Sequence, residues 1–380
     1  MYNIKLLNKI SNVGLAKFDT KEFAYADDME NPDAIMVRSA SMHDMEMPKS
    51  LLAIARAGAG TNNIPVADCA NQGIVVFNTP GANANAVKEL VLCLMLMCGR
   101  RIAPALNWAQ GLKGHEDINK ESESGKKAFI GGEIMGKTLG IAGLGAIGSK
   151  VADAAIALGM KVLGDNAHMT PEKAKRLNPA IKLVPMDELL AESDFITLHV
   201  PYNDSTKGMI NKEAIAKMKD GVNIINCARG ELVVSDDIVE AVKSGKVNRY
   251  ACDFASEAIL GVDGIIVTPH LGASTPEAED NCAEMAAKQM VDYIENGNIV
   301  NSVNYPALKK ERNGKARLCV CTKGVSDIKA LLAKEGVSVD DMAEAHKGDY
   351  GYAVADADKI CGCKAEKLCG IDGVLKARLI

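Results

Sequence analysis

Short apolar runs rich in β-branched residues alternate with amphipathic stretches along most of the chain. This alternation is typical of parallel strands joined by crossover helices. After a first strand at residues 1–10, the predicted strands are 34–37, 74–77, 138–142, 161–163, 195–199, 223–226, 250–254 and 265–268. The predicted helices between them are 149–158, 186–191, 212–218 and 235–243. The pattern therefore predicts an α/β fold built on a doubly wound parallel sheet.

The last third of the chain shows a different pattern. Residues 274–277 form a capping box that opens a long helix towards residue 296, and the turn-forming, charged segment 304–315 predicts a linker. Beyond it the predicted elements are strand 317–322, helix 327–334, strands 337–342 and 350–355, helix 365–368 and strand 374–379. This β-α-β-β-α-β order predicts a small ferredoxin-like module.

The longest apolar run of the chain is 87–98. It is too short to cross a bilayer and contains Lys88 and Glu89, so we expect a buried helix between domains. The first ten residues lack the apolar core and cleavage site of a signal peptide. We therefore expect a cytoplasmic protein without a membrane partner.

Composition and charge narrow the function further. A chain of 380 residues usually divides into two or three domains, and we expect three. The net charge of −5 and an aromatic content of 4% argue against a nucleic-acid partner. Eleven cysteines scattered through a long chain predict reduced thiols. Cys361, Cys363 and Cys369 lack the spacing of a four-ligand metal site, so no metal is expected.

A glycine-rich run, Gly143-Leu144-Gly145-Ala146-Ile147-Gly148, lies between a predicted strand and a predicted helix. In that setting the glycines allow a tight turn, close approach of a pyrophosphate and close helix packing, so the run predicts a dinucleotide site. Asp165, near the end of the next strand, is the expected ribose-binding acid and favours NAD over NADP. The alternative is that Asp165 is a solvated turn residue beside Asn166.

Three further strand ends carry polar residues that suit oxidation of a hydroxy acid. Such a reaction needs a base, a cation for the substrate carboxylate, and a group that orients the base. His270, Arg229 and Glu257 can fill these roles, because the carboxyl ends of parallel strands converge. Each residue taken singly could equally have a structural role.

The order of these motifs resembles that of the D-isomer-specific 2-hydroxyacid dehydrogenases, most closely the branch that acts on 3-phosphoglycerate. The resemblance rests on Val37-Arg38-Ser39, Arg56-Ala57-Gly58-Ala59-Gly60, Phe77-Asn78-Thr79-Pro80-Gly81, the glycine run, Leu198-His199-Val200-Pro201, Asn226-Cys227-Ala228-Arg229-Gly230 and Thr268-Pro269-His270-Leu271-Gly272. It implies a Rossmann cofactor domain at 86–272, a split flavodoxin-like substrate domain at 1–85 plus 273–303, the linker 304–315, and an ACT-like module at 316–380.

The resemblance also implies site residues. Arg229, Glu257 and His270 would be the catalytic set. NAD would contact Gly143, Gly145, Ala146, Ile147, Gly148, Asp165, Thr206, Cys227, Ala228, Arg229, Asp253, His270, Gly272 and Ala273. The substrate would contact Arg38, Ser39, Arg56, Gly58, Ala59 and Asn83, with the two arginines suited to a phosphate.

Three features depart from the family pattern. The family's ribose-binding acid aligns with Asn166, one residue after Asp165, and the spacing from Asp253 to Glu257 is one residue short. The module's first loop, 323–327, lacks the usual proline-glycine element that cups a serine ligand. Both a serine-binding module and an oligomerisation surface therefore remain open.

The function that the resemblance implies is oxidation of 3-phosphoglycerate to 3-phosphohydroxypyruvate with NAD, the first step of L-serine synthesis, by a homo-oligomer such as a dimer or tetramer. One alternative is a reductase of hydroxypyruvate, glyoxylate or another 2-keto acid. A second alternative, from another class, is a non-catalytic NAD-sensing binding protein.

Overall fold

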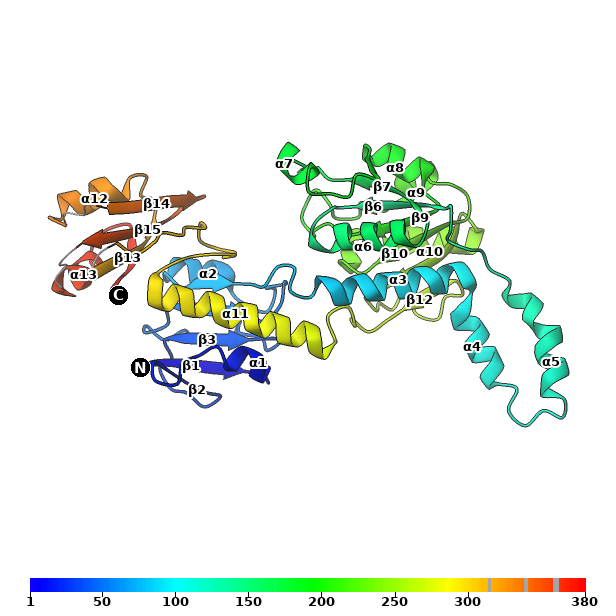
Figure 1. The fold of residues 1–380 in the computed structure, drawn as a ribbon, viewed down its shortest axis with the longest axis horizontal. Helices are drawn as coiled ribbons and strands as arrows, with labels where there is room; N and C mark the ends of the chain where they lie inside the picture. The colour runs from blue at the N-terminus through cyan, green and yellow to red at the C-terminus, as the bar shows by residue number, and fades with distance from the viewer. Residues whose placement is uncertain (168, 314–315, 338–340, 358–361) are drawn as a thin grey trace. The chain divides into compact units, whose positions relative to one another are not determined.

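The computed structural model describes residues 1–167, 169–313, 316–337, 341–357 and 362–380, and the chain divides into two compact units. One unit joins Met1–Asn83 to Pro276–Ile380, and the other is Ala84–Thr275. Each is described by itself (Figure 1).

The unit Ala84–Thr275 is built on seven parallel strands in the order β12-β11-β10-β9-β6-β7-β8. These are β6 (Thr138–Ala142), β7 (Lys161–Asp165), β8 (Ile181–Leu183), β9 (Phe195–Leu198), β10 (Val222–Asn226), β11 (Val247–Cys252) and β12 (Ile265–Val267). The winding reverses between β6 and β9, and this reversal is where open α/β sheets bind ligands. The predicted doubly wound sheet is therefore confirmed.

Helices cover this sheet and also extend away from it. They are α3 (Ala84–Arg100), α6 (Ala146–Ala157), α7 (Pro171–Ala174), α8 (Met186–Glu192), α9 (Lys212–Lys217) and α10 (Ser235–Ser244). Helix α3 buries Val91, Leu94 and Met95, as expected for the apolar run 87–98. Helices α4 (Ile102–Gln110) and α5 (Ile118–Gly125) extend from the unit as an arm without a buried residue in either helix (Figure 1).

The other unit contains a five-stranded parallel sheet in the order β2-β1-β3-β4-β5. Its strands are β1 (Tyr2–Leu7), β2 (Phe23–Ala26), β3 (Ala34–Val37), β4 (Ala53–Arg56) and β5 (Val75–Phe77), with helices α1 (Asn12–Leu15), α2 (Val66–Asn71) and α11 (Pro276–Asn296). Alternate residues of each strand point to opposite faces. Met36 therefore joins the cluster against α11, whereas Ile35 and Val37 join the cluster that contains Cys69 of α2.

The C-terminal part of this unit is a four-stranded antiparallel sheet in the order β14-β15-β13-β16. Its elements are β13 (Ala316–Lys323), α12 (Ile328–Lys334), β14 (Asp341–Lys347), β15 (Tyr350–Ala357), α13 (Gly362–Leu368) and β16 (Val374–Leu379). Leu318 and Val320 face a core with α12 and α13, while Cys319 and Cys321 join the core formed with α11. Both faces of the sheet are therefore covered within this unit.

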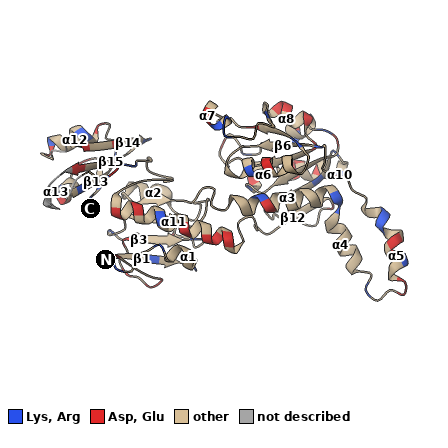
Figure 2. Cartoon of the chain, in the orientation of Figure 1, with Lys and Arg blue, Asp and Glu red and all other residues tan. Residues whose placement is uncertain are grey.

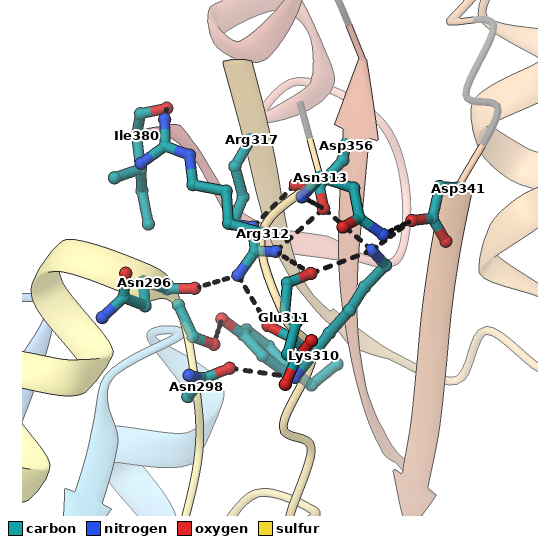
Figure 3. A network of polar contacts seen from close by, with 12 residues as sticks. Asn296, Asn298, Lys310, Glu311, Arg312, Asn313, Arg317, Asp341, Asp356 and Ile380 are labelled. Atoms are coloured by element: carbon teal, nitrogen blue, oxygen red, sulfur yellow. Dashed lines mark hydrogen bonds and ion pairs between the residues drawn. The ribbon is translucent and has the colours of Figure 1, made fainter. Parts of the chain in front are cut away.

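A buried arginine joins the antiparallel sheet to the end of α11 (Figure 3). Arg317 is fully buried, and its guanidinium donates to both carboxylate oxygens of Asp356 at 2.7 and 2.8 Å. It also donates to the carbonyls of Asn296, Lys310 and Glu311 at 2.7 to 3.0 Å. The predicted linker is held at these points and by Tyr305, which is buried and donates to the carbonyl of Ala70.

Several predicted element boundaries were wrong. The strand expected at 337–342 runs instead from Asp341 to Lys347, and residues 338–340 lie outside the described part. Val337 packs in the core beside α12, so its burial does not reflect strand pairing. Strand β7 runs from Lys161 to Asp165, two residues beyond the predicted end at residue 163. The short strands β2, β4 and β8 were not predicted.

Candidate functional site

The predicted cofactor and catalytic residues all lie in the unit Ala84–Thr275, at the carboxyl edge of its sheet or in the loops that follow. Gly143 follows β6, Asp165 ends β7, and Cys227 follows β10. Asp253 follows β11, and the loop with His270 follows β12. Because parallel strands end at one edge, this topology gathers these residues there.

The glycine loop has the space that a dinucleotide phosphate needs. A Cβ on Gly143 would lie 2.6 Å from the carbonyl oxygen of His199, and one on Gly148 would lie 2.0 Å from that of Gly143. A Cβ on Gly145 would meet nothing within 4 Å. The first and third glycines are thus required by packing, whereas the second leaves open space at the N-terminus of α6, where backbone N–H groups bind anions. These residues fit a pyrophosphate.

The acidic residue expected at the ribose lies beside this loop. Asp165 is the last residue of β7 and pairs in register with Ala142, the last residue of β6. Its carbonyl accepts a hydrogen bond from the N–H of Gly143 at 2.8 Å. Asn166 lies one residue beyond the strand. Partial burial raises the pKa of the Asp165 carboxyl above its ordinary value.

A buried asparagine shapes the loop that carries Arg229. The side chain of Asn226 is fully buried, accepts from the N–H of Ala228 at 3.1 Å and donates to the carbonyl of Arg229 at 2.8 Å. The Arg229 guanidinium donates to the carbonyl of Ala228 and is partly exposed. Asn226 was part of a recognised motif, but sequence reasoning gave it no role.

Asp253 holds the loop that carries His270. Its Oδ1 accepts from the Thr268 hydroxyl at 2.6 Å and from the N–H of Leu271 at 2.7 Å. Its Oδ2 accepts from the N–H of Gly272 at 2.8 Å, and the residue is 1% exposed. The carboxylate predicted to contact the cofactor therefore has its oxygens directed at residues on both sides of His270.

His270 and Glu257 are both exposed. The backbone of His270 is left-handed, with φ of 59°, and its ring packs on Phe254 with centroids 5.0 Å apart. Across the described residues there is no hydrogen bond or ion pair between His270 and Glu257. The structure thus places both residues after neighbouring strands, but it does not pair them.

Sequence reasoning also gave no role to His199, which follows β9. Its Nε2 lies 3.0 Å from the hydroxyl of Thr197, and its Nδ1 is buried without a partner in the described part of the chain. Burial lowers the pKa of His199 to about 4, so the ring is neutral at physiological pH. The ring next to the glycine loop is therefore uncharged.

The remaining predicted cofactor residues take ordinary loop positions. The Thr206 hydroxyl donates to the carbonyl of Pro201 at 2.7 Å and accepts from the N–H of Asn203, so it shapes the loop after β9. Burial raises the pKa of the Cys227 thiol far above its usual value, which keeps this thiol protonated. Ala146 and Ile147 begin α6, and Ala273 follows Gly272.

The predicted substrate residues lie in the other unit, at the carboxyl edge of the five-stranded sheet. Arg38 follows β3, and Arg56 ends β4 in register with Val37. A Cβ on Gly58 would lie 1.3 Å from a guanidinium nitrogen of Arg56, so this glycine, with φ of 153°, leaves room for that side chain. Exposed Ser39 donates its N–H to Asn8 at 2.9 Å.

Two further predicted substrate residues are Ala59, which follows Gly58, and Asn83, which ends the segment Met1–Asn83. The carbonyl of Ala59 accepts from the Asn78 side chain at 2.7 Å. Asn83 is the last residue of this segment and is partly exposed. Asn78 belongs to a recognised motif but was not among the predicted site residues.

Membrane-spanning helices and metal-binding groups are two features that would indicate other functions. No helix among them is long and apolar enough to cross a membrane. None of their His, Cys, Asp and Glu side chains gather in groups of three or more that could hold a metal ion. The nine cysteines whose side chains are described are free thiols, and those of Cys361 and Cys363 lie outside the described part.

Comparison with known proteins gives consistent matches. The model of the D-isomer-specific 2-hydroxyacid dehydrogenase NAD-binding domain matches residues 92–272. A D-3-phosphoglycerate dehydrogenase of Synechocystis is 37% identical over 323 residues, covering 83% of this chain and 56% of that protein. A hydroxypyruvate reductase of Thermotoga maritima is 44% identical over 259 residues, covering 65% of this chain and 80% of that protein.

A solved structure is similar along most of its length. The NAD-bound 3-phosphoglycerate dehydrogenase of Entamoeba histolytica superposes with a TM-score of 0.61 at 27% identity, covering 80% of this chain and 98% of that one. The present chain thus spans about half the length of several curated relatives and nearly all of this solved structure.

Proposed function

The chain belongs to the family of D-isomer-specific 2-hydroxyacid dehydrogenases, and from this premise we propose that it oxidises 3-phosphoglycerate to 3-phosphohydroxypyruvate with NAD. This reaction is the first step of L-serine synthesis. The observation that carries the proposal is the pair of loops that the buried Asn226 and Asp253 hold at one sheet edge, one with Arg229 and the other with His270.

Each catalytic residue has a proposed role. His270 takes the proton from the substrate hydroxyl, because an imidazole nitrogen can act as a general base. Arg229 binds the substrate carboxylate through its planar guanidinium. Glu257 is the carboxylate proposed to orient His270, although it follows Asp253 at a shorter spacing than is usual in the family. Bound NAD would supply the acceptor for the hydride of the carbinol carbon.

NAD is the proposed cofactor, held by Gly143, Gly145, Ala146, Ile147, Gly148, Asp165, Thr206, Cys227, Ala228, Arg229, Asp253, His270, Gly272 and Ala273. Support comes from the open space at Gly145 and from Asp165 at the end of the neighbouring strand. We expect Asp165→Ala to reduce the preference for NAD over NADP, since a carboxylate there repels a 2′-phosphate. Asn166→Ala should leave the ratio of the two kcat/KM values unchanged; the opposite result would assign the ribose contact to Asn166.

The substrate phosphate is proposed to bind at Arg38 and Arg56, with Ser39, Gly58, Ala59 and Asn83 completing the contacts. The two arginines lie at the ends of neighbouring parallel strands, an arrangement suited to a dianion. We expect Arg38→Ala or Arg56→Ala to raise the KM for 3-phosphoglycerate far more than that for D-glycerate. Equal effects on the two substrates would contradict the phosphate assignment.

The overall test is a steady-state assay of NAD and NADP reduction with 3-phosphoglycerate, D-glycerate, 2-hydroxyglutarate and D-lactate. The proposal predicts the highest kcat/KM for 3-phosphoglycerate with NAD. Faster turnover of unphosphorylated acids would favour the second candidate, a hydroxypyruvate or glyoxylate reductase, which the similarity to the Thermotoga protein supports. Absence of turnover with every acid would favour a non-catalytic NAD-sensing protein.

A homo-oligomer is the proposed assembly. In support, the arm of α4 and α5 exposes Ile102, Leu106 and Ile118 by 38 to 56%, and apolar surface of this kind is typical of subunit contacts. Leu106→Glu should lower the mass measured by light scattering.

The free thiols fit a reducing compartment, and we propose the cytoplasm.

We further propose that residues 316–380 form an ACT-like module, joined to the rest of the chain by the linker 304–315. The substrate domain is proposed to comprise residues 1–85 and 273–303, and the cofactor domain residues 86–272. The β-α-β-β-α-β order and the antiparallel sheet support the module assignment. The loop at 323–327 lacks the element that cups serine, so a structural role is favoured over feedback by serine.

A further inference from the structure

Two arginines lie together at the carboxyl edge of the five-stranded sheet. Arg38 directly follows β3, and Arg56 is the last residue of the adjacent strand β4. The Nε of Arg56 donates to the backbone carbonyl of Arg38 at 3.1 Å, which holds the Arg56 side chain at the end of the neighbouring strand. Two guanidinium groups so placed give this edge a local positive charge that attracts anions.

Helix α11 brings a carboxylate to one of these arginines. Oε1 of Glu279 lies 2.5 Å from Nη2 of Arg38, and their side chains are 40% and 37% exposed. Acidic residues gather along α11 (Figure 2), and Glu279 belongs to its first turn, where the helix dipole favours negative charge. The carboxylate is thus held beside the arginine pair by its own helix.

The charges of these three residues affect the pKa of a buried thiol on the same helix, Cys282. Burial raises the pKa of the Cys282 thiol, and a hydrogen bond with Thr79 lowers it. The charges of Arg56 and Arg38 also lower this pKa, whereas that of Glu279 raises it. Cys282 is 4% exposed and points into the core shared by the sheet and α11. The hydrogen bond from Arg56 to the Arg38 carbonyl and the ion pair of Arg38 with Glu279 link these three charged residues, which we call the Arg38 cluster.

The carboxylate changes what the Arg38 cluster can bind. It occupies part of the guanidinium fork of Arg38 and halves the formal charge of the arginine pair from +2 to +1. A phosphate dianion that approaches Arg38 must compete with Glu279 and is repelled by its charge, whereas a neutral hydroxymethyl group at the same place is not. An exposed ion pair adds little stability, so its main effect is on the anions that bind.

We propose that Glu279 is a specificity-determining residue, which weakens the binding of phosphorylated substrates at Arg38 and Arg56 and so reduces the preference of this site for them over unphosphorylated 2-hydroxy acids. The proposal rests on the proposed function, because it takes the two arginines as the place where the distal end of the substrate binds.

The test compares Glu279→Gln with Glu277→Gln. Both changes remove one negative charge from the first turn of α11, but Glu277 is exposed and forms no ion pair within the described residues. Binding of 3-phosphoglycerate, inorganic phosphate and D-glycerate to the full chain is measured by calorimetry. Turnover of the two organic acids is measured in parallel, and melting temperatures check the fold.

We expect Glu279→Gln to lower the Kd for 3-phosphoglycerate roughly three- to tenfold at low ionic strength, as removal of a unit charge nearby implies. The gain should shrink at high salt, because the cluster is partly exposed. The Kd of Glu279→Gln for D-glycerate should change less than about twofold, because this acid brings no phosphate charge to Arg38. The Kd values of Glu277→Gln for all three compounds should also change less than about twofold, because Glu277 is not paired with Arg38.

Three outcomes would overturn the proposal. Weaker binding of 3-phosphoglycerate by Glu279→Gln would mean that the carboxylate orients Arg38 for the substrate. An equal gain for D-glycerate, or with Glu277→Gln, would mean a general charge effect. No binding of either phosphate compound by any variant would remove the cluster as an anion site. If Glu279→Gln bound 3-phosphoglycerate more tightly but no variant oxidised either acid, the proposed function would be refuted and the role of Glu279 in anion binding would be supported.

Discussion

Two buried polar side chains, Asp253 and Asn226, organise the edge of the seven-stranded sheet. The N–H of Asp253 donates to the carbonyl of Asn226 at 3.1 Å, which connects the ends of β11 and β10. Buried polar groups of this kind are costly unless they are fully hydrogen-bonded, and each here bonds a loop that carries a proposed catalytic residue. The position of His270 therefore depends on a residue that need not touch the substrate.

The change Asp253→Asn tests this dependence. An amide offers one acceptor oxygen in place of two, so either the Gly272 N–H or the Thr268 and Leu271 donors lose their partner. We expect kcat/KM to fall on the order of 100-fold, because small displacements of catalytic groups have large kinetic effects. Stability should fall by about 1 to 3 kcal/mol.

The matched control for this change is Asp263→Asn, at an exposed residue of the segment that precedes β12. Steady-state kinetics and thermal melting of both variants provide the measurement. If Asp253→Asn retained full activity, Asp253 would not be needed to hold the loop of His270.

The same residues show where sequence reasoning stops. The sequence placed Arg229, Asp253 and His270 at or after strand ends, because apolar runs mark strands and topology brings their carboxyl ends to one edge. It could not show that the oxygens of Asp253 bond the backbone of residues 271 and 272, since such bonds depend on the path of a loop. The expected pairing of Glu257 with His270 is not seen.

At the scale of elements, the strand-loop-helix unit from β6 to α6 is the part whose geometry follows most directly from its sequence. Gly143 and Gly148 have no space for a side chain, whereas Gly145 has an extended backbone and open surroundings. Folding and ligand binding therefore make separate demands on neighbouring glycines. This separation allows the two demands to be tested independently.

We expect Gly145→Ala to fold as well as the unaltered chain but to bind NAD more weakly. The added methyl group meets no protein atom within 4 Å, yet it occupies the space proposed for the pyrophosphate. The Kd for NAD should rise on the order of tenfold, equal to about 1.4 kcal/mol, with no change in melting temperature.

Two other glycine substitutions serve as controls for Gly145→Ala. Gly132→Ala also has open surroundings but lies outside the loop, so neither property should change. Gly148→Ala should lower the melting temperature, because its Cβ would lie 2.0 Å from a backbone oxygen. Unchanged NAD affinity in Gly145→Ala, measured by fluorescence titration, would argue against pyrophosphate binding at this loop.

Elements were predicted well where a continuous apolar run specified them. The strands β3, β6 and β16 match the predicted ranges in full. The missed strands β2, β4 and β8 have only three or four residues and little apolar, β-branched sequence, so packing partners from distant segments define them. The arm of α4 and α5 buries no residue in either helix, and its apolar positions gave no signal of a core.

At the scale of the whole molecule, the C-terminal module shares a core with the five-stranded sheet and α11 and bonds the end of that helix. Arg378 lies 4.5 Å from the ring centroid of Tyr293 and donates to the carbonyls of Tyr293 and Ile294. Arg317 and Tyr352 donate to those of Asn296 and Gly297. Cations are favourable at a helix C-terminus, so the module stabilises α11 where its backbone lacks partners.

The ion pair of Arg317 and Asp356 makes this attachment sensitive to acid. Burial alone would raise the pKa of the Asp356 carboxyl, but hydrogen bonds from Arg317, Lys310 and the N–H of Asn313 outweigh it and hold that pKa well below its usual value. A carboxyl whose pKa is depressed on folding contributes stability at neutral pH. This contribution is lost as pH falls from the unfolded pKa, about 4, towards the folded one.

Replacing Asp356 by Asn should therefore destabilise the chain at pH 7 and matter less in acid. At pH 7 the change leaves the buried Arg317 without its carboxylate, and we expect a loss of about 3 kcal/mol. The difference in melting temperature between the two proteins should narrow as pH falls below about 4, because the unaltered protein then loses the same interaction. Asp349→Asn, at an exposed residue of the module, is the control. A difference that stayed constant from pH 7 to pH 3 in calorimetry would show that the charge of Asp356 does not stabilise the attachment.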